Sequence, residues 1–231
     1  DLHSFPTRRS SDLVGDMGQV ISIISGKGGT GKSFFAANMG ALLAMNGKSV
    51  VLIDMDMGMR SLDIYMGLEN RIVYNIMDVL SGMCRIKQAM IKDKRFKSLY
   101  LMSAAPPRDH RDITGMHMKV LCDKLKDDYD YIIIDGPTGV DEGLDLAAGP
   151  SDVAVIITEP EAASIRDADI VDRQLSKMGV KKRYCVVNKV KAELMAMGAV
   201  PSLRDITDGL RIKMAGDRKS TRLNSSHGRR S

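Results

Sequence analysis

The chain has 231 residues, 44% of them hydrophobic, which is enough to bury one sizeable α/β core. Its net charge is +5, but residues 217–231 alone hold five basic residues and one acidic residue, so the body 14–216 is nearly neutral. A nearly neutral body argues against a nucleic-acid-binding face, and no apolar run approaches the roughly 18 residues of a membrane span. The first residues do not show the signal-peptide pattern of a charged segment followed by an apolar one.

The three cysteines are Cys84, Cys122 and Cys185, which are widely spaced and form no CxxC pair. That pattern is typical of reduced thiols and argues against a disulfide framework or a zinc site. We therefore expect a cytoplasmic protein.

The two ends of the chain differ from its body, because they are polar and have little periodicity. Residues 2–13 match the translation of a widely used short-read sequencing adapter, and residues 217–227 match the translation of its companion. We expect 1–13 and 217–231 to be artefactual or disordered tails around one ATPase domain, 14–216, that is truncated at its C-terminus. The alternative is a natural basic tail that binds nucleic acid or a membrane.

The first expected elements are a buried strand at 20–24 and a helix at 34–46, separated by a glycine-rich segment. That segment fits the phosphate-loop pattern, in which a Gly and four free positions precede Gly, Lys and Ser or Thr. A strand, a glycine loop and a helix in this order direct backbone N–H groups and a helix N-terminus at one polyphosphate. The pattern predicts a nucleoside triphosphate site formed by Gly26, Gly28, Gly29, Thr30, Gly31, Lys32, Ser33 and Phe34.

Two residues of this loop carry the chemistry. Lys32 is expected to reach the β- and γ-phosphates as a catalytic residue, and the Ser33 hydroxyl is expected to ligate Mg²⁺.

Strand-like apolar runs alternate with helical segments along the rest of the body. Strands are expected at 49–53, 99–102, 131–135, 153–157 and 184–187, with a last one beginning at 211–214 and cut off at Gly216. Helices are expected at 76–80 (capped by Asn75), 116–125 and 161–178. This alternation predicts an α/β fold of the P-loop NTPase type, with a mostly parallel sheet and helices on both faces.

Asp135 closes the most strand-like segment and precedes Gly136-Pro137. A phosphate-loop protein places a second carboxylate there to hold Mg²⁺, partly through water, and we assign Asp135 this metal and catalytic role. The segment 136–139 would then sense the γ-phosphate. Capping of the next helix is the alternative role for Asp135.

Asp54 and Asp56 end a neighbouring strand, and side chains two residues apart point the same way if the extended conformation persists. One carboxylate could orient the attacking water while the other contacts the metal shell. We place Asp56 with the catalytic residues and Asp54 in the Mg²⁺ shell, and the opposite assignment stays open, as does a solvated acidic loop. No Glu follows Asp135, so we expect a slow, switch-like hydrolysis.

The phosphate-loop pattern does not require a lysine at position 27. With Lys27, the loop resembles the deviant Walker A motif of the ParA/MinD family of ATPases, and the match is strongest to its septum-placing MinD branch. Departures are Ser61, where Asn is usual, and Gly136, where Ser is common. The resemblance covers about residues 18–216 and runs through 53–63, 91–95, 135–139 and 159–169.

The resemblance implies the roles of two more residues. In that family the lysine matching Lys27 reaches the nucleotide of the partner subunit in an ATP-sandwich homodimer, which makes Lys27 nucleotide-binding and catalytic. Hydrolysis of ATP to ADP and phosphate separates the dimer. Asn188 matches the residue that binds adenine, although a strand-end Asn could equally cap a turn.

The cofactors implied are ATP and Mg²⁺. The partners implied are the division-site inhibitor MinC and a topological-specificity factor, MinE or one linked to DivIVA. In that family a C-terminal amphipathic helix docks the ATP-bound dimer on the inner face of the cell membrane, as a peripheral protein. This chain ends before that helix, so membrane binding is expected of the natural protein only.

Four other functions stay open at this point. Two belong to the same superfamily, a DNA-binding partition ATPase and a flagellar-number regulator. The third is an iron–sulfur electron donor, which requires paired cysteines at a subunit interface. The fourth is a nucleotide-binding scaffold without turnover.

Overall fold

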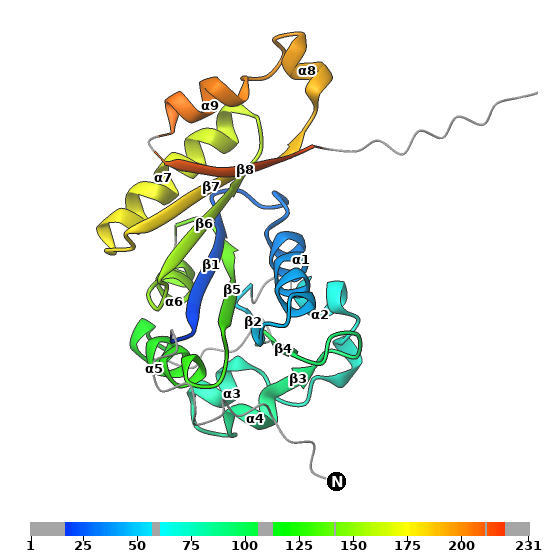
Figure 1. The fold of residues 1–231 in the computed structure, drawn as a ribbon. Coiled ribbons are helices and arrows are strands. Elements are labelled where there is room, and N and C mark those ends of the chain that lie inside the picture. The colour runs from blue at the N-terminus through cyan, green and yellow to red at the C-terminus, as the bar shows by residue number, and fades with distance from the viewer. Residues whose placement is uncertain (1–16, 57–60, 106–112, 141, 211, 220–231) are drawn as a thin grey trace, which may run out of the picture.

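The computed structural model describes residues 17–56, 61–105, 113–140, 142–210 and 212–219. Over these residues the chain forms one eight-stranded sheet in the order β3-β4-β2-β5-β1-β6-β7-β8, with helices on both of its faces (Figure 1). β3 is antiparallel to β4, and the other neighbouring strands are parallel. The predicted α/β fold with a mostly parallel sheet is therefore confirmed.

The strands are β1 (Gln19–Ser25), β2 (Val50–Asp54), β3 (Met90–Lys92), β4 (Leu99–Met102), β5 (Tyr131–Thr138), β6 (Val153–Thr158), β7 (Lys182–Val190) and β8 (Lys213–Lys219). The helices are α1 (Lys32–Met45), α2 (Ser61–Met66), α3 (Ile76–Leu80), α4 (Ile86–Ala89), α5 (Gly115–Lys126), α6 (Glu142–Ala148), α7 (Ala162–Lys177), α8 (Ala192–Ala196) and α9 (Leu203–Gly209), with a short 3-10 helix at Glu69–Arg71. None of the helices in the described part of the chain is long and apolar enough to span a membrane.

The central strands are apolar on both sides because helices cover both faces of the sheet. Residues of β1 alternate between the two layers: Val20 packs with α3 and α5, whereas Ile21 and Ile23 pack with α1 and α2. Ile24 belongs to a third cluster with α6, α7 and α9. Burial of β1 on both faces holds the start of the phosphate loop in place.

The strands predicted at 131–135 and 184–187 are longer in the structure. β5 continues past Asp135 to Thr138, which pairs with Ser25 after a register shift in β1, so Asp135 lies inside the strand and does not close it. β7 continues to Val190 and contains Asn188. Pairing with a neighbouring strand extends both segments beyond their apolar cores, and the apolar pattern alone does not report that pairing.

The expected last strand begins at Lys213 and runs beyond Gly216 to Lys219, beside β7. The tail 1–13 and residues 220–231 of the other tail lie outside the described residues. Sequence patterns also missed β3, which is three residues long, and the short helices α2, α4, α6, α8 and α9.

The cap expected at Asn75 is present. Its side-chain oxygen accepts hydrogen bonds from the backbone N–H groups of Met77 (2.8 Å) and Asp78 (3.3 Å). Asp78 in turn accepts one from the N–H of Asn75, which completes a capping box at the start of α3.

Gly40 of α1 packs closely against side chains of the sheet. A Cβ atom there would lie 2.9 Å from Cδ2 of Leu52 and 3.3 Å from Cδ1 of Leu99. We therefore expect Gly40→Val to lower the free energy of unfolding by about 1–3 kcal/mol, because the added methyl groups overpack the core. Urea unfolding measures the change.

Leu42→Val is the matched control for Gly40→Val, because it places the same β-branched residue on an exposed position of α1. Equal stabilities of the two variants would contradict the close packing of α1 on the sheet.

Candidate active site at the phosphate loop

The path of the phosphate loop requires glycine at three positions. Gly29 and Gly31 have φ angles of 76° and 96°, which residues with a Cβ atom rarely adopt. A Cβ on Gly31 would also lie 2.5 Å from Nδ2 of Asn188. A Cβ on Gly26 would lie 2.5 Å from Cβ of Asp167 in α7, so the first glycine of the motif lets that helix pack against the loop.

Lys32 is the first residue of α1, and only 5% of its surface is exposed. Burial lowers its pKa, and the negative charges of Asp135 and Asp56 only partly counter this effect. The ammonium group is thus held where water solvates it poorly. A bound anion would stabilise its charged form.

Asp135 lies on β5 and is fully buried. Burial raises its pKa to about 7, while the nearby Ser33 hydroxyl and the charge of Lys32 lower it in part. Neither carboxylate oxygen has a hydrogen-bond partner of regular geometry among the described residues, so Ser33 lies beside the carboxylate without a well-formed bond to it.

Asp54 lies on β2, in register with Asp135 on the adjacent strand. Its carboxylate accepts hydrogen bonds from the backbone N–H groups of Asp56 (2.9 Å) and Leu62 (3.3 Å). Burial, and then the charge of Asp135, raise the pKa of Asp54 to about 8. Two neighbouring carboxyl groups with raised pKa values can both ionise readily only beside a cation.

The polar atoms left without partners fit a magnesium-bound nucleotide. Besides the two oxygens of Asp135, the hydroxyl of Thr30 is buried without a hydrogen bond in the described structure, and such groups are costly unless a ligand satisfies them. The described residues hold no cluster of three or more His, Cys, Asp or Glu side chains suited to a metal. Mg²⁺ needs no such cluster, since one or two carboxylates and substrate phosphates usually hold it.

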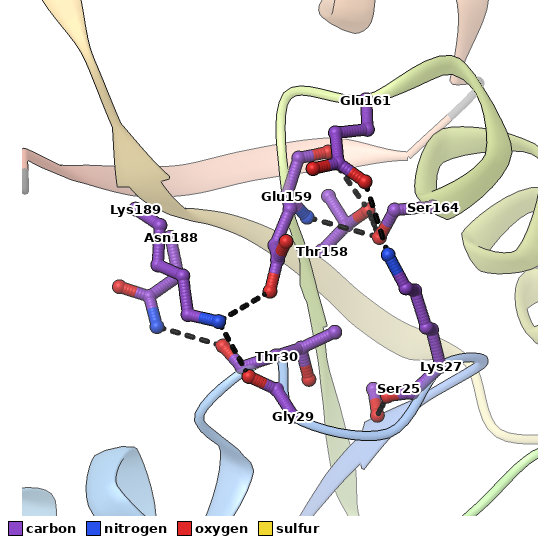
Figure 2. Close-up of polar contacts among 10 residues, drawn as sticks. All are labelled: Ser25, Lys27, Gly29, Thr30, Thr158, Glu159, Glu161, Ser164, Asn188 and Lys189. Carbon is purple, nitrogen blue, oxygen red and sulfur yellow. Dashed lines mark hydrogen bonds and ion pairs between the residues drawn. The ribbon is translucent and has the colours of Figure 1, made fainter.

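Lys27 lies on the outer side of the loop, with 42% of its side chain exposed. Its Nζ donates a hydrogen bond to Oε2 of Glu161 at 3.0 Å, and this contact raises the pKa of Lys27 (Figure 2). An exposed pair of this kind contributes little to stability and is exchanged easily.

Asn188 of β7 contacts the loop directly, because its Nδ2 donates to the backbone carbonyl of Thr30 at 2.7 Å (Figure 2). Phe34, in the first turn of α1, meets the ring of Tyr65 edge to face, with the ring centroids 6.0 Å apart. The expected nucleotide contacts of Asn188 and Phe34 stay predictions.

Two residues beside the loop were missed by sequence patterns. Lys189 donates to the carbonyl of Gly29 and to Oε1 of Glu159, both at 2.7 Å (Figure 2). Glu159 and Lys189 belong to no phosphate-loop pattern, and 160 positions separate Lys189 from Gly29. The Asn-Lys pair that follows the apolar run 184–187 is a local pattern that could have indicated Lys189, and Glu159 opens the 159–169 segment of the family resemblance.

A cavity of about 1090 Å³ lies away from the loop, between α3, α4 and α5. None of the predicted site residues lines it. Cys122 and Cys185 are buried in two different clusters, where burial raises the pKa of each thiol to about 12. A thiol with so high a pKa is poorly suited to ligate an iron–sulfur cluster, which requires thiolates.

Comparisons with known proteins agree with this geometry. A family model described as an AAA domain matches residues 18–182. The septum site-determining protein MinD of Synechocystis is 44% identical over 200 residues, which is 87% of this chain and 75% of that protein.

Two solved structures are also similar. The MinC:MinD cell division protein complex of Aquifex aeolicus aligns with a TM-score of 0.82 and 42% identity, over 88% of this chain and 82% of that one. MinD of Pyrococcus horikoshii, solved with Mg-ADP, aligns with a TM-score of 0.79 and 25% identity, over 89% and 82% of the two chains.

The raised pKa values predict how the stability of the nucleotide-free protein depends on pH. The folded chain keeps protons on Asp54 and Asp135 that the unfolded chain, with carboxyl pKa values near 3.8, has already lost. The free energy of unfolding should therefore fall as the pH rises from about 4 to about 8. Urea unfolding at several pH values without nucleotide measures it.

Asp135→Asn removes one of the two groups that cause this slope. At about pH 8 we expect this variant to be more stable than the wild type by about 1.4 kcal/mol or more, which corresponds to one pKa unit, with a smaller gain near pH 4. Asp123→Asn, at an exposed position of α5, is the control and should not change the slope. An unchanged slope in Asp135→Asn would mean that Lys32 already compensates the charge.

Proposed function

The chain belongs to the MinD family of septum site-determining ATPases, and we propose that it acts as an ATP-gated homodimeric switch in placing the division septum. The proposed cycle has three steps: ATP binding with Mg²⁺ at the phosphate loop, dimerisation, and slow hydrolysis that separates the subunits. The observation that supports it best is the buried, unpartnered carboxylate of Asp135 beside Lys32. That arrangement suits a ligand that carries both a cation and an anion.

We assign the site residues as the sequence predicts. The loop amide groups, Thr30 and Lys32 would bind the phosphates. Ser33, Asp135 and Asp54 would hold Mg²⁺, directly or through water, and the ion would neutralise charge on the phosphate oxygens. Asp56, half-buried beyond the end of β2, would orient the attacking water.

Lys27 would change partners between the two states of the switch. In the single subunit it is paired with Glu161, at 3.0 Å. We propose that it leaves this exposed pair and reaches the nucleotide of the partner subunit when the dimer forms. Because a solvent-screened pair is weak, its loss would oppose dimerisation only slightly.

The partner proteins are proposed from one relative and from the family resemblance. MinD of Aquifex aeolicus was solved in a complex with MinC, and we propose a MinC-type inhibitor as a partner of this chain. A specificity factor of the MinE or DivIVA-linked type is proposed from the family resemblance, as is peripheral binding of the full-length, ATP-bound protein at the inner membrane face. Nucleic acid is not proposed as a partner.

The test is light scattering on the purified chain with ATP, with ADP and without nucleotide, together with the phosphate released. We expect a dimer with ATP alone and slow release of phosphate. A monomer under all three conditions, with no nucleotide bound by fluorescence titration, would refute the proposal.

Lys27→Ala separates dimerisation from nucleotide binding. Because Lys27 is on the outer side of the loop, the variant should bind ADP as tightly as the wild type but stay monomeric with ATP, and its hydrolysis rate should fall at least about tenfold. Lys48→Ala, at an exposed position after α1, is the matched control. A Lys27→Ala chain that still dimerises would show that Lys27 serves no partner subunit.

A further inference from the structure

The carboxyl end of β7 holds the phosphate loop from the side opposite α1. Two consecutive residues reach it: Nδ2 of Asn188 donates to the carbonyl of Thr30, and Nζ of Lys189 donates to the carbonyl of Gly29, each at 2.7 Å (Figure 2). Two adjacent carbonyl groups of the loop are thus fixed by one strand end.

These contacts determine where the loop N–H groups point. In a trans peptide the carbonyl of one residue and the N–H of the next point in opposite directions, and the described chain contains no cis peptide. The N–H groups of Thr30 and Gly31 therefore point away from Asn188 and Lys189, to the other side of the loop. A phosphate would bind there.

Lys189 adopts an unfavourable backbone conformation in making its contact. Its φ is 56°, and it is the only residue other than glycine in the described chain with a positive φ. The backbone is irregular there, since the pairing of β7 with β8 shifts register between Val187 and Val190. Such a conformation persists only where the surroundings enforce it, and it is often found at functional sites.

Glu159 provides part of that enforcement. Its Oε1 pairs with Nζ of Lys189 at 2.7 Å, and its side chain is 11% exposed. Its backbone N–H donates to the hydroxyl of Ser164 in α7 at 3.1 Å, and that hydroxyl also bonds to Thr158 at 2.9 Å. Glu159 is therefore a fixed anchor, and Lys189 connects it to the loop.

We propose that Lys189 is a positioning residue for nucleotide binding: anchored by Glu159, it holds the Gly29 carbonyl so that the loop N–H groups face the phosphates before nucleotide arrives. Lys189 acts through the loop and is not a catalytic residue. The proposal rests on the proposed function, because it assumes that the loop binds a nucleotide. Preorganised donors bind an anion without the entropy cost of ordering the loop.

The first measurement is made without nucleotide, as ¹⁵N order parameters of Gly29, Thr30 and Gly31. We expect values of about 0.85 in the wild type and below about 0.6 in Lys189→Met, which keeps the side-chain length but cannot donate. Arg173→Met is the control, because it removes another basic partner of an ion pair, with Asp169 at 2.7 Å on α7. Equally rigid loops in wild type and Lys189→Met would overturn the proposal.

The second measurement is the dissociation constant for Mg-ADP, by fluorescence titration. We expect Lys189→Met to bind about tenfold more weakly, as for loss of one hydrogen bond from a charged donor, and Lys189→Arg to recover most of the loss. Equal losses in the Met and Arg variants would contradict the role of the ammonium group.

Two further variants separate positioning from folding. Lys189→Gly removes both the strain of the positive φ and the contact with Gly29. This variant should have a melting temperature no lower than that of the wild type, and it should bind Mg-ADP weakly. A lower melting temperature with unchanged Mg-ADP affinity would mean that Lys189 has a structural role only. In a double-mutant cycle, the losses of Mg-ADP affinity caused by Glu159→Gln and Lys189→Met should be non-additive, because both variants break the same ion pair. If the wild-type loop is rigid but the wild type binds no Mg-ADP, the proposed function is refuted, although Lys189 still holds the Gly29 carbonyl.

Discussion

The strongest constraint on this structure comes from three ionisable side chains buried near the carboxyl ends of its central strands: Lys32, Asp54 and Asp135. Each loses hydration on folding, and the two carboxyl groups repel each other from adjacent strands in register. A fold that served stability alone would replace them with apolar residues. Burial of the surrounding sheet, which is apolar on both faces, offsets the free-energy cost of these buried groups, whose charges are balanced only when a ligand binds.

The sequence predicted the parts of this site that are local. The phosphate loop is a contiguous motif, and Asp54 and Asp135 follow apolar runs whose strand character is evident from their residues alone. The contacts of Lys189 and Asn188 with the loop were not predictable, because they join segments about 160 residues apart and depend on β7 extending beyond its apolar core. Family resemblance supplied roles for Lys27 and Asn188, but not the contacts these residues make in the single subunit.

The loop is thus held by two elements of different character. On one side α1 begins within the motif itself, and its position follows from local sequence. On the other side Asn188 and Lys189 of β7 donate hydrogen bonds to loop carbonyl groups, and Glu159, which follows β6, pairs with Lys189. Changes in the packing of α7 against Gly26 would therefore alter the loop without changing any residue of the motif.

The antiparallel strand β3 has a consequence outside the site. It forms one edge of the sheet, is three residues long and ends in the exposed Lys92. A long, flat edge strand has unpaired backbone groups to which strands of other chains can bind, and a short edge strand with a lysine makes such pairing unfavourable. At that edge, the fold protects itself against aggregation through intermolecular strand pairing, while its opposite edge ends in the parallel strand β8.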